Sequence, residues 1–264
     1  MKYVDDGINA EVVNMKEVPL MLTGQDRFKE TNAHATTLLL ELIRKNAELK
    51  GMKVNERKTS LMCVSAARSF EAKVELKFNG QSVSGKDSLK ILGVTLDKDC
   101  TFNSHVINVA KSLRSRTWAL AKLRRKGMKQ EDLVQAFKTT IRPAAEYASP
   151  VWDSLINAGQ SEYLERQQIQ AMKNIYGIGM SARKMRQKSG IERLWKRRET
   201  ACRNFALKNL NNPRCNGWFQ ERPVPLYARR SGAAYNLYKE PLSRTDWHRN
   251  SPINYARRIL NRIS

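Results

Sequence analysis

The hydrophobic pattern of the first hundred residues changes from a helical period to a β period. Apolar residues recur every three or four positions between about residues 26 and 50, and Gly51 follows where a helix would end. Alternating or β-branched runs then predict short strands at residues 52–54, 61–64, 74–78 and 89–96. Asn79-Gly80 predicts a two-residue hairpin. We expect an α+β arrangement, an antiparallel sheet with the helix packed on one face.

After this mixed segment the pattern becomes helical and basic. An apolar stripe over residues 106–123 predicts a long helix that ends at Gly127. A second helix is predicted over residues 130–141, with an interruption near Pro143, and a third over residues 161–176.

The last third of the chain has a weaker pattern. Residues 183–203 are dense in positive charge with apolar residues interspersed, which predicts one or two more amphipathic helices. Proline and glycine from residue 211 onward predict a loop-rich, basic tail. The chain is therefore divided into residues 1–100, 101–180 and 181–264.

The charge balance narrows the class of partner. The chain has 264 residues, of which 48 are Lys or Arg and 25 are Asp or Glu, giving a formal net charge of +23. Such a field favours polyanions, and nucleic acid is the usual cellular polyanion. An anionic membrane surface is the competing partner, but the basic residues are spread over several segments instead of one amphipathic helix.

Cysteine spacing and hydropathy indicate the compartment. Four cysteines lie far apart without a Cys-x-x-Cys pair, which favours thiols in a reducing environment over a zinc site; they are Cys63, Cys100, Cys202 and Cys215. Early acidic residues and the lack of an apolar run argue against a signal peptide or a membrane span. We expect an intracellular protein, nuclear or cytoplasmic, that is not secreted and does not enter a membrane.

Two adjacent carboxylates near the start are candidate metal ligands. Tyr3-Val4-Asp5-Asp6 precedes Gly7, and the apolar residues of 8–13 predict a returning strand, so Asp5 and Asp6 would lie at a hairpin turn. Carboxylates at such a turn could hold Mg²⁺, a cation that prefers oxygen ligands. An ordinary surface turn is the alternative interpretation.

Three stretches in this order resemble one protein family. They are Lys-Tyr-Val-Asp-Asp at 2–6, Leu-Lys-Gly-Met-Lys-Val-Asn-Glu-Arg-Lys-Thr at 49–59 and Lys-Ile-Leu-Gly-Val-Thr-Leu-Asp at 90–97. Together they resemble the second half of the palm of a non-LTR retrotransposon reverse transcriptase of the jockey-like type. Arg-Pro-Ala-Ala-Glu-Tyr-Ala-Ser-Pro-Val-Trp at 142–152 is similar to a segment in the helical region after that palm.

The resemblance implies an RNA-directed DNA polymerase with a partial palm, an all-α thumb and a basic tail. Asp5 and Asp6 would hold Mg²⁺ for two-metal nucleotidyl transfer, and Lys58 would neutralise or protonate the departing phosphates. Tyr3, Leu92 and Gly93 would lie against nucleic acid. The thumb would bind phosphates through a set of basic side chains, which are Lys111, Arg114, Lys122, Arg124, Arg125 and Lys126.

Simpler interpretations of these residues stay open. Lys58 could be a solvated loop lysine, and Leu92-Gly93 an ordinary strand with a glycine bulge. Each basic thumb residue could belong to a solvated helix face.

The implied partners are an RNA template, a DNA primer and deoxynucleoside triphosphates. The family has a further Asp and fingers that would precede Lys2, so we expect a fragment that is inactive by itself. The alternative function is a non-catalytic, basic nucleic-acid-binding protein.

Overall fold

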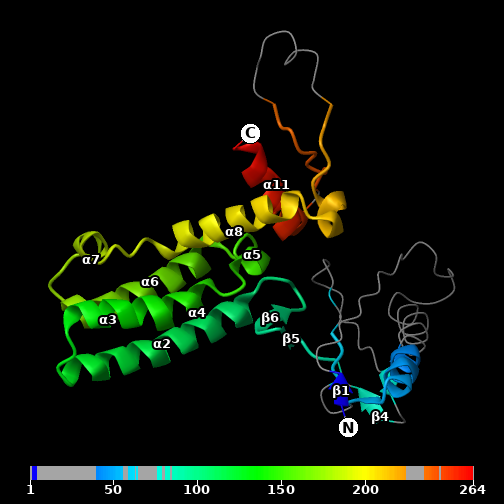
Figure 1. Cartoon of the computed structure of the whole chain (residues 1–264), viewed down its shortest axis with the longest axis horizontal. Helices are drawn as coiled ribbons and strands as arrows, with labels where there is room; N and C mark the ends of the chain where they lie inside the picture. Colours follow the sequence, from blue (N-terminus) through cyan, green and yellow to red (C-terminus); the bar gives the residue numbers. More distant parts are fainter. Residues whose placement is uncertain are drawn as a thin grey trace. The chain divides into compact units, whose positions relative to one another are not determined.

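The computed structural model describes residues 2–4, 40–55, 59–62, 64, 76–78, 81–83, 85–223, 235–243 and 245–263. The chain divides into two compact units, Met1–Cys100 and Thr101–Ser264, which are considered separately (Figure 1). Short strands and one helix make up the described part of the first unit, and helices dominate the second. The protein is therefore α+β. Residues 101–180 and 181–264, which the sequence pattern separated, belong to one unit.

The strands described in the first unit form three two-stranded ladders. These are β1 (Lys2–Val4) with β2 (Met52–Val54), β3 (Leu76–Phe78) with β4 (Gln81–Val83), and β5 (Ser88–Ile91) with β6 (Val94–Asp97). The first ladder is parallel and the other two are antiparallel, which corrects the prediction of a single antiparallel sheet. Parallel neighbours need a crossover connection, and the helix at residues 40–49 lies in the sequence between β1 and β2.

The described strands of this unit form two hairpins, and the sequence pattern predicted the first of them. Phe78 pairs with Gln81, which confirms the hairpin at Asn79-Gly80. The single strand predicted over residues 89–96 was wrong, because the chain turns at Leu92 and Gly93 with φ of 46° and 86°. Positive φ at both central residues fits the twist of a two-residue hairpin, although leucine seldom adopts it.

Two other predictions for the first unit have different outcomes. The helix at residues 40–49 ends at Gly51, whose φ of 67° is that of a C-terminal cap, as predicted. The strand predicted over residues 61–64 is reduced to an isolated bridge between Leu61 and Gly85.

Helices make up most of the described part of the second unit. They are α2 (Asn103–Arg125), α3 (Gln130–Ala136), a π-helical segment η3 (Phe137–Ile141), α4 (Arg142–Glu146), α5 (Ser149–Trp152), α6 (Ala158–Tyr176), α7 (Ala182–Ser189), α8 (Leu194–Leu210), a 3-10 segment η4 (Pro213–Trp218), α10 (Asp246–Arg249) and α11 (Pro252–Asn261). The predicted helix end at Gly127 is confirmed, with φ of 84°. The predicted end at residue 176 is also confirmed, because Gly177 with φ of 96° is the C-cap of α6. Among the helices described, none is long and apolar enough to cross a lipid bilayer.

The predicted interruption near Pro143 was wrong. Helical structure continues from α3 through η3 into α4, and the backbone N–H of Arg142 donates to the carbonyl oxygen of Phe137, five residues earlier. Proline lacks an N–H, and its ring clashes with the preceding turn of a regular α-helix. The wider π turn next to Pro143 accommodates this conflict without ending the helix.

The core of the second unit lies between α2, the α3–α4 helix and α6, which lie side by side in Figure 1. Leu113 of α2, Phe137 of η3 and Leu164 of α6 are fully buried. On each of these helices the apolar residues recur every three or four positions, which places them on one face. The packing of the three helices therefore follows from the sequence pattern.

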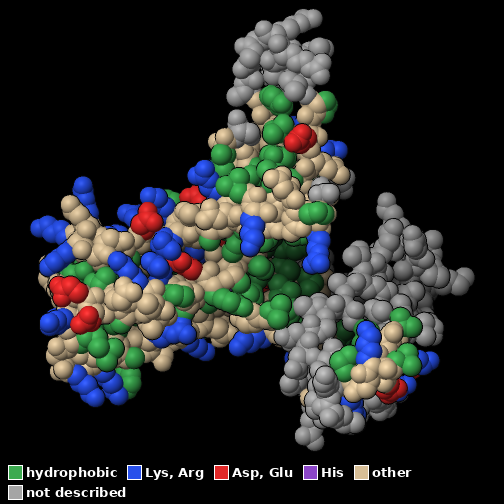
Figure 2. All heavy atoms as spheres, in the orientation of Figure 1, with side chains coloured by type: hydrophobic (Ala, Val, Ile, Leu, Met, Phe, Trp, Pro, Cys, Tyr) green, Lys and Arg blue, Asp and Glu red, His purple; other side chains and the backbone are tan. Residues whose placement is uncertain are grey.

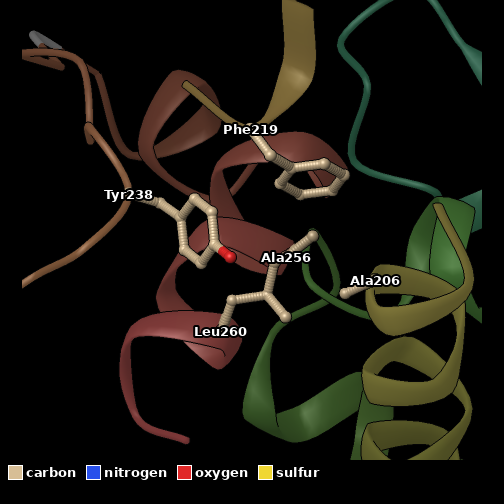
Figure 3. Packing of buried hydrophobic residues seen from close by; sticks show 5 residues of the cluster. All are labelled: Ala206, Phe219, Tyr238, Ala256 and Leu260. Atoms are coloured by element: carbon tan, nitrogen blue, oxygen red, sulfur yellow. The ribbon is translucent and has the colours of Figure 1, made fainter. Parts of the chain in front are cut away.

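A second cluster joins α8 to the C-terminal helix α11 (Figure 3). Its buried residues are Ala206, Phe219, Tyr238, Ala256 and Leu260. The loop-rich tail predicted from residue 211 is corrected at its C-terminal end, because α11 is a regular helix that packs on α8. The described residues 219–223 and 235–243 contain no helix, as that prediction expected. Pro252 fits the first turn of α11, because proline at the start of a helix has no intrahelical N–H bond to lose.

Helix α8 carries a buried arginine. The side chain of Arg198 is 0% exposed; its Nε donates to Asp153 Oδ1 at 2.5 Å and its Nη2 to Ser161 Oγ at 2.8 Å. The guanidinium carbon lies 5.4 Å from the ring centroid of Trp152. Burying a guanidinium is costly without a counter-charge, so Asp153 is essential to this arrangement.

We expect Asp153→Ala to lower the free energy of unfolding by about 3 kcal/mol, because it leaves the buried Arg198 charge without a counter-ion. Urea denaturation followed by circular dichroism measures the change. Glu162→Ala is the control: its pair with Arg166 is 3.9 Å long, and the two side chains are 66% and 60% exposed. The Glu162→Ala substitution should lower the free energy of unfolding by less than about 1 kcal/mol. Equal losses in the two variants would contradict a special role for the buried pair.

Candidate nucleic-acid interface

The residues predicted from the sequence fall into three groups. Asp5, Asp6 and Lys58 lie outside the described residues, as does the returning strand predicted over residues 8–13. Tyr3 lies in β1, where its backbone is described.

The second group is Leu92 and Gly93, which form the turn between β5 and β6 in the first unit. Leu92 is 65% exposed there. The basic residues predicted for the thumb form the third group, and all of them lie on α2 or at its C-cap in the second unit.

Helix α2 has an unusual charge composition. It contains no acidic residue, and its basic residues are Lys111, Arg114, Arg116, Lys122, Arg124 and Arg125. All of these side chains are exposed. Figure 2 shows Lys and Arg side chains gathered over the end of α2 at the lower left.

Four of the cations share one face of the helix. Lys111, Arg114, Lys122 and Arg125, with Trp118 between them, follow one another at intervals of three or four residues. Side chains at these intervals are neighbours on a helix surface. We call these five residues the α2 stripe. At 1.5 Å per residue it extends over about 21 Å.

Neutral groups of α6 hold Arg114 in place. Its Nη2 donates to the Tyr163 hydroxyl at 2.5 Å, and its Nε donates to Gln167 Oε1 at 3.3 Å. The guanidinium carbon also lies 5.7 Å from the Tyr163 ring centroid. None of these partners neutralises the charge, so Arg114 is positioned while its remaining N–H groups can still donate to an anion.

Trp118 and Lys122 form the centre of the α2 stripe. Trp118 is 58% exposed, and the ammonium nitrogen of Lys122 lies 3.6 Å from its ring centroid. The sequence prediction did not include Trp118. Its position four residues after Arg114 and four before Lys122 could have indicated it.

Arg124 has a different environment from the other cations. Its Nη1 donates at 3.0 Å to the carbonyl oxygen of Asn174, in the last turn of α6. Such terminal carbonyls lack intrahelical partners, so Arg124 satisfies the end of α6 as well as adding positive charge. Lys126 is the C-cap residue of α2 and is exposed.

Described carboxylates do not pair with the cations of this face. Among the described residues, none of the basic side chains of α2 takes part in a salt bridge. Glu165, a buried carboxylate of α6, is used in other contacts: one oxygen accepts from Arg186 at 2.8 Å and the other from the backbone N–H of Leu194 at 2.8 Å. The α2 stripe therefore keeps its positive charge.

A second candidate site is a hollow of about 240 Å³ in the same unit. It is lined by Asp153, Ile156, Asn157, Ala158, Ser161, Trp195, Glu199 and Tyr255. Burial raises the pKa of Asp153, an effect that Arg198 opposes, and it raises the pKa of Tyr255 to about 12. Burial likewise raises the pKa of the nearby Cys202 thiol to about 12. The Tyr255 hydroxyl and the Cys202 thiol are therefore poor nucleophiles at neutral pH. The carboxyl groups of Asp153 and Glu199 in the lining are unfavourable for binding phosphate.

The described part of the chain also contains no group of three His, Cys, Asp or Glu residues that could hold a metal ion. Asp5 and Asp6 lie outside that search. Comparisons with protein-family models, curated proteins and solved structures found no match to this chain.

The α2 stripe should contribute little to stability. We expect the double variant Lys111→Gln/Arg125→Gln to change the free energy of unfolding by less than about 0.5 kcal/mol. At low salt the double variant should be slightly more stable than the wild type, because the substitutions remove like charges from one helix face.

Arg197→Gln is the control for that urea-denaturation measurement. Arg197 forms two hydrogen bonds with Glu146, one of them 3.0 Å long, and Glu146 is only 18% exposed. Its loss should lower stability by about 1–3 kcal/mol. A similar loss in the double variant would show that the stripe has a structural role.

Proposed function

We propose that the helical unit binds nucleic acid through the α2 stripe. The observation that carries the proposal is a run of exposed cations on one helix face without carboxylate partners among the described residues. Phosphates are the complementary ligand, because one strand of a duplex presents a charge about every 3.4 Å along the axis. A face about 21 Å long could follow about six such charges.

A membrane surface is a poorer partner for this helix. Basic helices that bind membranes insert an apolar face between lipids. The apolar face of α2, which includes Val106, Leu113 and Leu120, is buried in the bundle. Only the charged face is available, and it fits a phosphate backbone better than a bilayer.

The wider proposal is an RNA-directed DNA polymerase of the non-LTR retrotransposon type. It rests on the sequence resemblance, with the first unit as part of the palm and the helical unit as the thumb. Asp5 and Asp6 would hold Mg²⁺, Lys58 would lie near the nucleotide phosphates, and the partners would be an RNA template, a DNA primer and deoxynucleoside triphosphates. The exposed turn at Leu92-Gly93 supports this proposal, because a hairpin tip with a glycine allows close backbone approach.

A non-catalytic nucleic-acid-binding protein is the second candidate. The basic residues of α2 lie in the helical unit, and phosphate binding by them needs neither Asp5 nor a metal ion. This observation favours the non-catalytic candidate.

Binding should depend steeply on salt. We expect the slope of log affinity against log salt to fall by about 1 for each side chain removed in Lys111→Gln/Arg125→Gln, because each phosphate contact releases a counter-ion. Fluorescence anisotropy with a labelled oligonucleotide measures this slope.

The control for net charge is Arg203→Gln/Lys208→Gln. Both residues are exposed on α8, and the double substitution changes the net charge by the same amount. If both double variants reduce the salt slope equally, binding depends on net charge and not on the α2 stripe. If the affinity of the wild type does not depend on salt, nucleic-acid binding by α2 is contradicted.

Primer extension distinguishes the two candidates. If the wild-type chain incorporates deoxynucleotides on a primed RNA template with Mg²⁺, we expect Asp5→Ala to abolish this activity, because the substitution removes a metal-binding carboxylate. Binding of the same primed template by anisotropy should be unchanged. Incorporation that survives Asp5→Ala would contradict the catalytic role of Asp5. Salt-dependent binding by both proteins without extension by either would favour the non-catalytic candidate.

A further inference from the structure

Trp118 is the feature of the α2 stripe that phosphate binding leaves unexplained. A basic helix face needs only Lys and Arg to bind a phosphate backbone. The stripe instead has a large aromatic side chain at its centre, 58% exposed, with two cations on either side along the helix. Another tryptophan of this unit, Trp152, is fully buried in the core. The exposed indole thus provides a flat apolar surface among positive charges.

The ligand that fits this combination has a flat, apolar-faced ring attached to anionic groups. A nucleobase with its phosphates has that chemistry, and every base can stack on an aromatic side chain. Inside a duplex, the faces of the bases are covered by their neighbours, and side chains reach only base edges in the grooves. Stacking on an exposed helix face therefore requires an unpaired base.

We propose that Trp118 stacks on an unpaired base of single-stranded nucleic acid whose phosphates are bound by the cations of the α2 stripe. The inference rests on the proposed function and specifies its ligand. Tyr163 and Gln167 hold the Arg114 guanidinium on one side of Trp118, with N–H donors remaining for a phosphate. Lys122 lies over the indole at 3.6 Å, and its flexible stem lets it move from the ring to a phosphate when a base arrives.

The test compares one labelled oligonucleotide as a single strand and as a blunt duplex, using the full chain. Trp118→Leu keeps an apolar residue and a good helix former but removes the aromatic ring. We expect it to weaken single-strand binding by about 5- to 100-fold and duplex binding by less than about 2-fold. The salt slope should stay unchanged for both ligands, because no phosphate contact is lost. Trp118→Phe should restore part of the single-strand affinity.

Trp195→Leu is the matched control. Trp195 is also exposed, at 46%, but it lines the hollow that contains Asp153 and Glu199, so its loss should leave binding unchanged. A single strand that carries 5-iodouracil should also form a photo-crosslink to Trp118, which peptide mass spectrometry can locate.

The outcomes separate this inference from the proposed function. A wild-type chain that binds neither ligand overturns both. Wild-type binding with no effect of Trp118→Leu, or with equal losses for single strand and duplex, overturns only the stacking inference. Loss of binding to phosphatidylserine-containing vesicles in Trp118→Leu, with oligonucleotide binding unchanged, would also overturn it and assign Trp118 to a lipid interface.

Discussion

The buried guanidinium of Arg198 constrains the whole helical unit. Its charge is stable in the core only because Asp153 at the end of α5 and Ser161 of α6 bind it, with Trp152 beside it. The neighbouring Arg197 binds Glu146 at the end of α4. Two consecutive residues thus attach α8 to three other elements. Because α8 also packs on α11 through the cluster in Figure 3, the C-terminal segments are positioned by the same helix.

This use of carboxylates inside the unit has a consequence for its surface. Asp153, Glu146 and Glu165 are bound by arginines or backbone N–H groups between helices, so they are not available to outward-facing cations. In the described part of the chain, Arg114 of the α2 stripe contacts the neutral side chains of Tyr163 and Gln167, and Lys122 contacts the Trp118 ring within the stripe. Arginine therefore stabilises the fold where it faces a buried carboxylate and provides charge for a ligand where it does not. The proposed binding surface follows from this division.

The segment at 142–152, on which part of the proposed reverse-transcriptase resemblance rests, has a structural role in the fold. Pro143 follows the π turn, Glu146 binds Arg197, and Trp152 is fully buried with its Nε1 donating to the carbonyl oxygen of Tyr147 at 3.0 Å. None of these groups needs a ligand to explain its position. The segment thus holds the helices that present α2, which agrees with a unit proposed to bind nucleic acid without taking part in chemistry.

The sequence by itself determined the elements whose signals are local. Helical periodicity and a following glycine predicted α2 and α6, and Asn79-Gly80 predicted its hairpin, because these patterns depend on residues a few positions apart. The cations of α2 were predicted too, but only the tertiary structure distinguished Arg124, which binds the end of α6, from the stripe around Trp118. The parallel pairing of β1 with β2 and the packing of α11 on α8 were likewise decided by distant partners. A local pattern defines a helix or turn, whereas the partner that buries or pairs with it lies elsewhere in the chain.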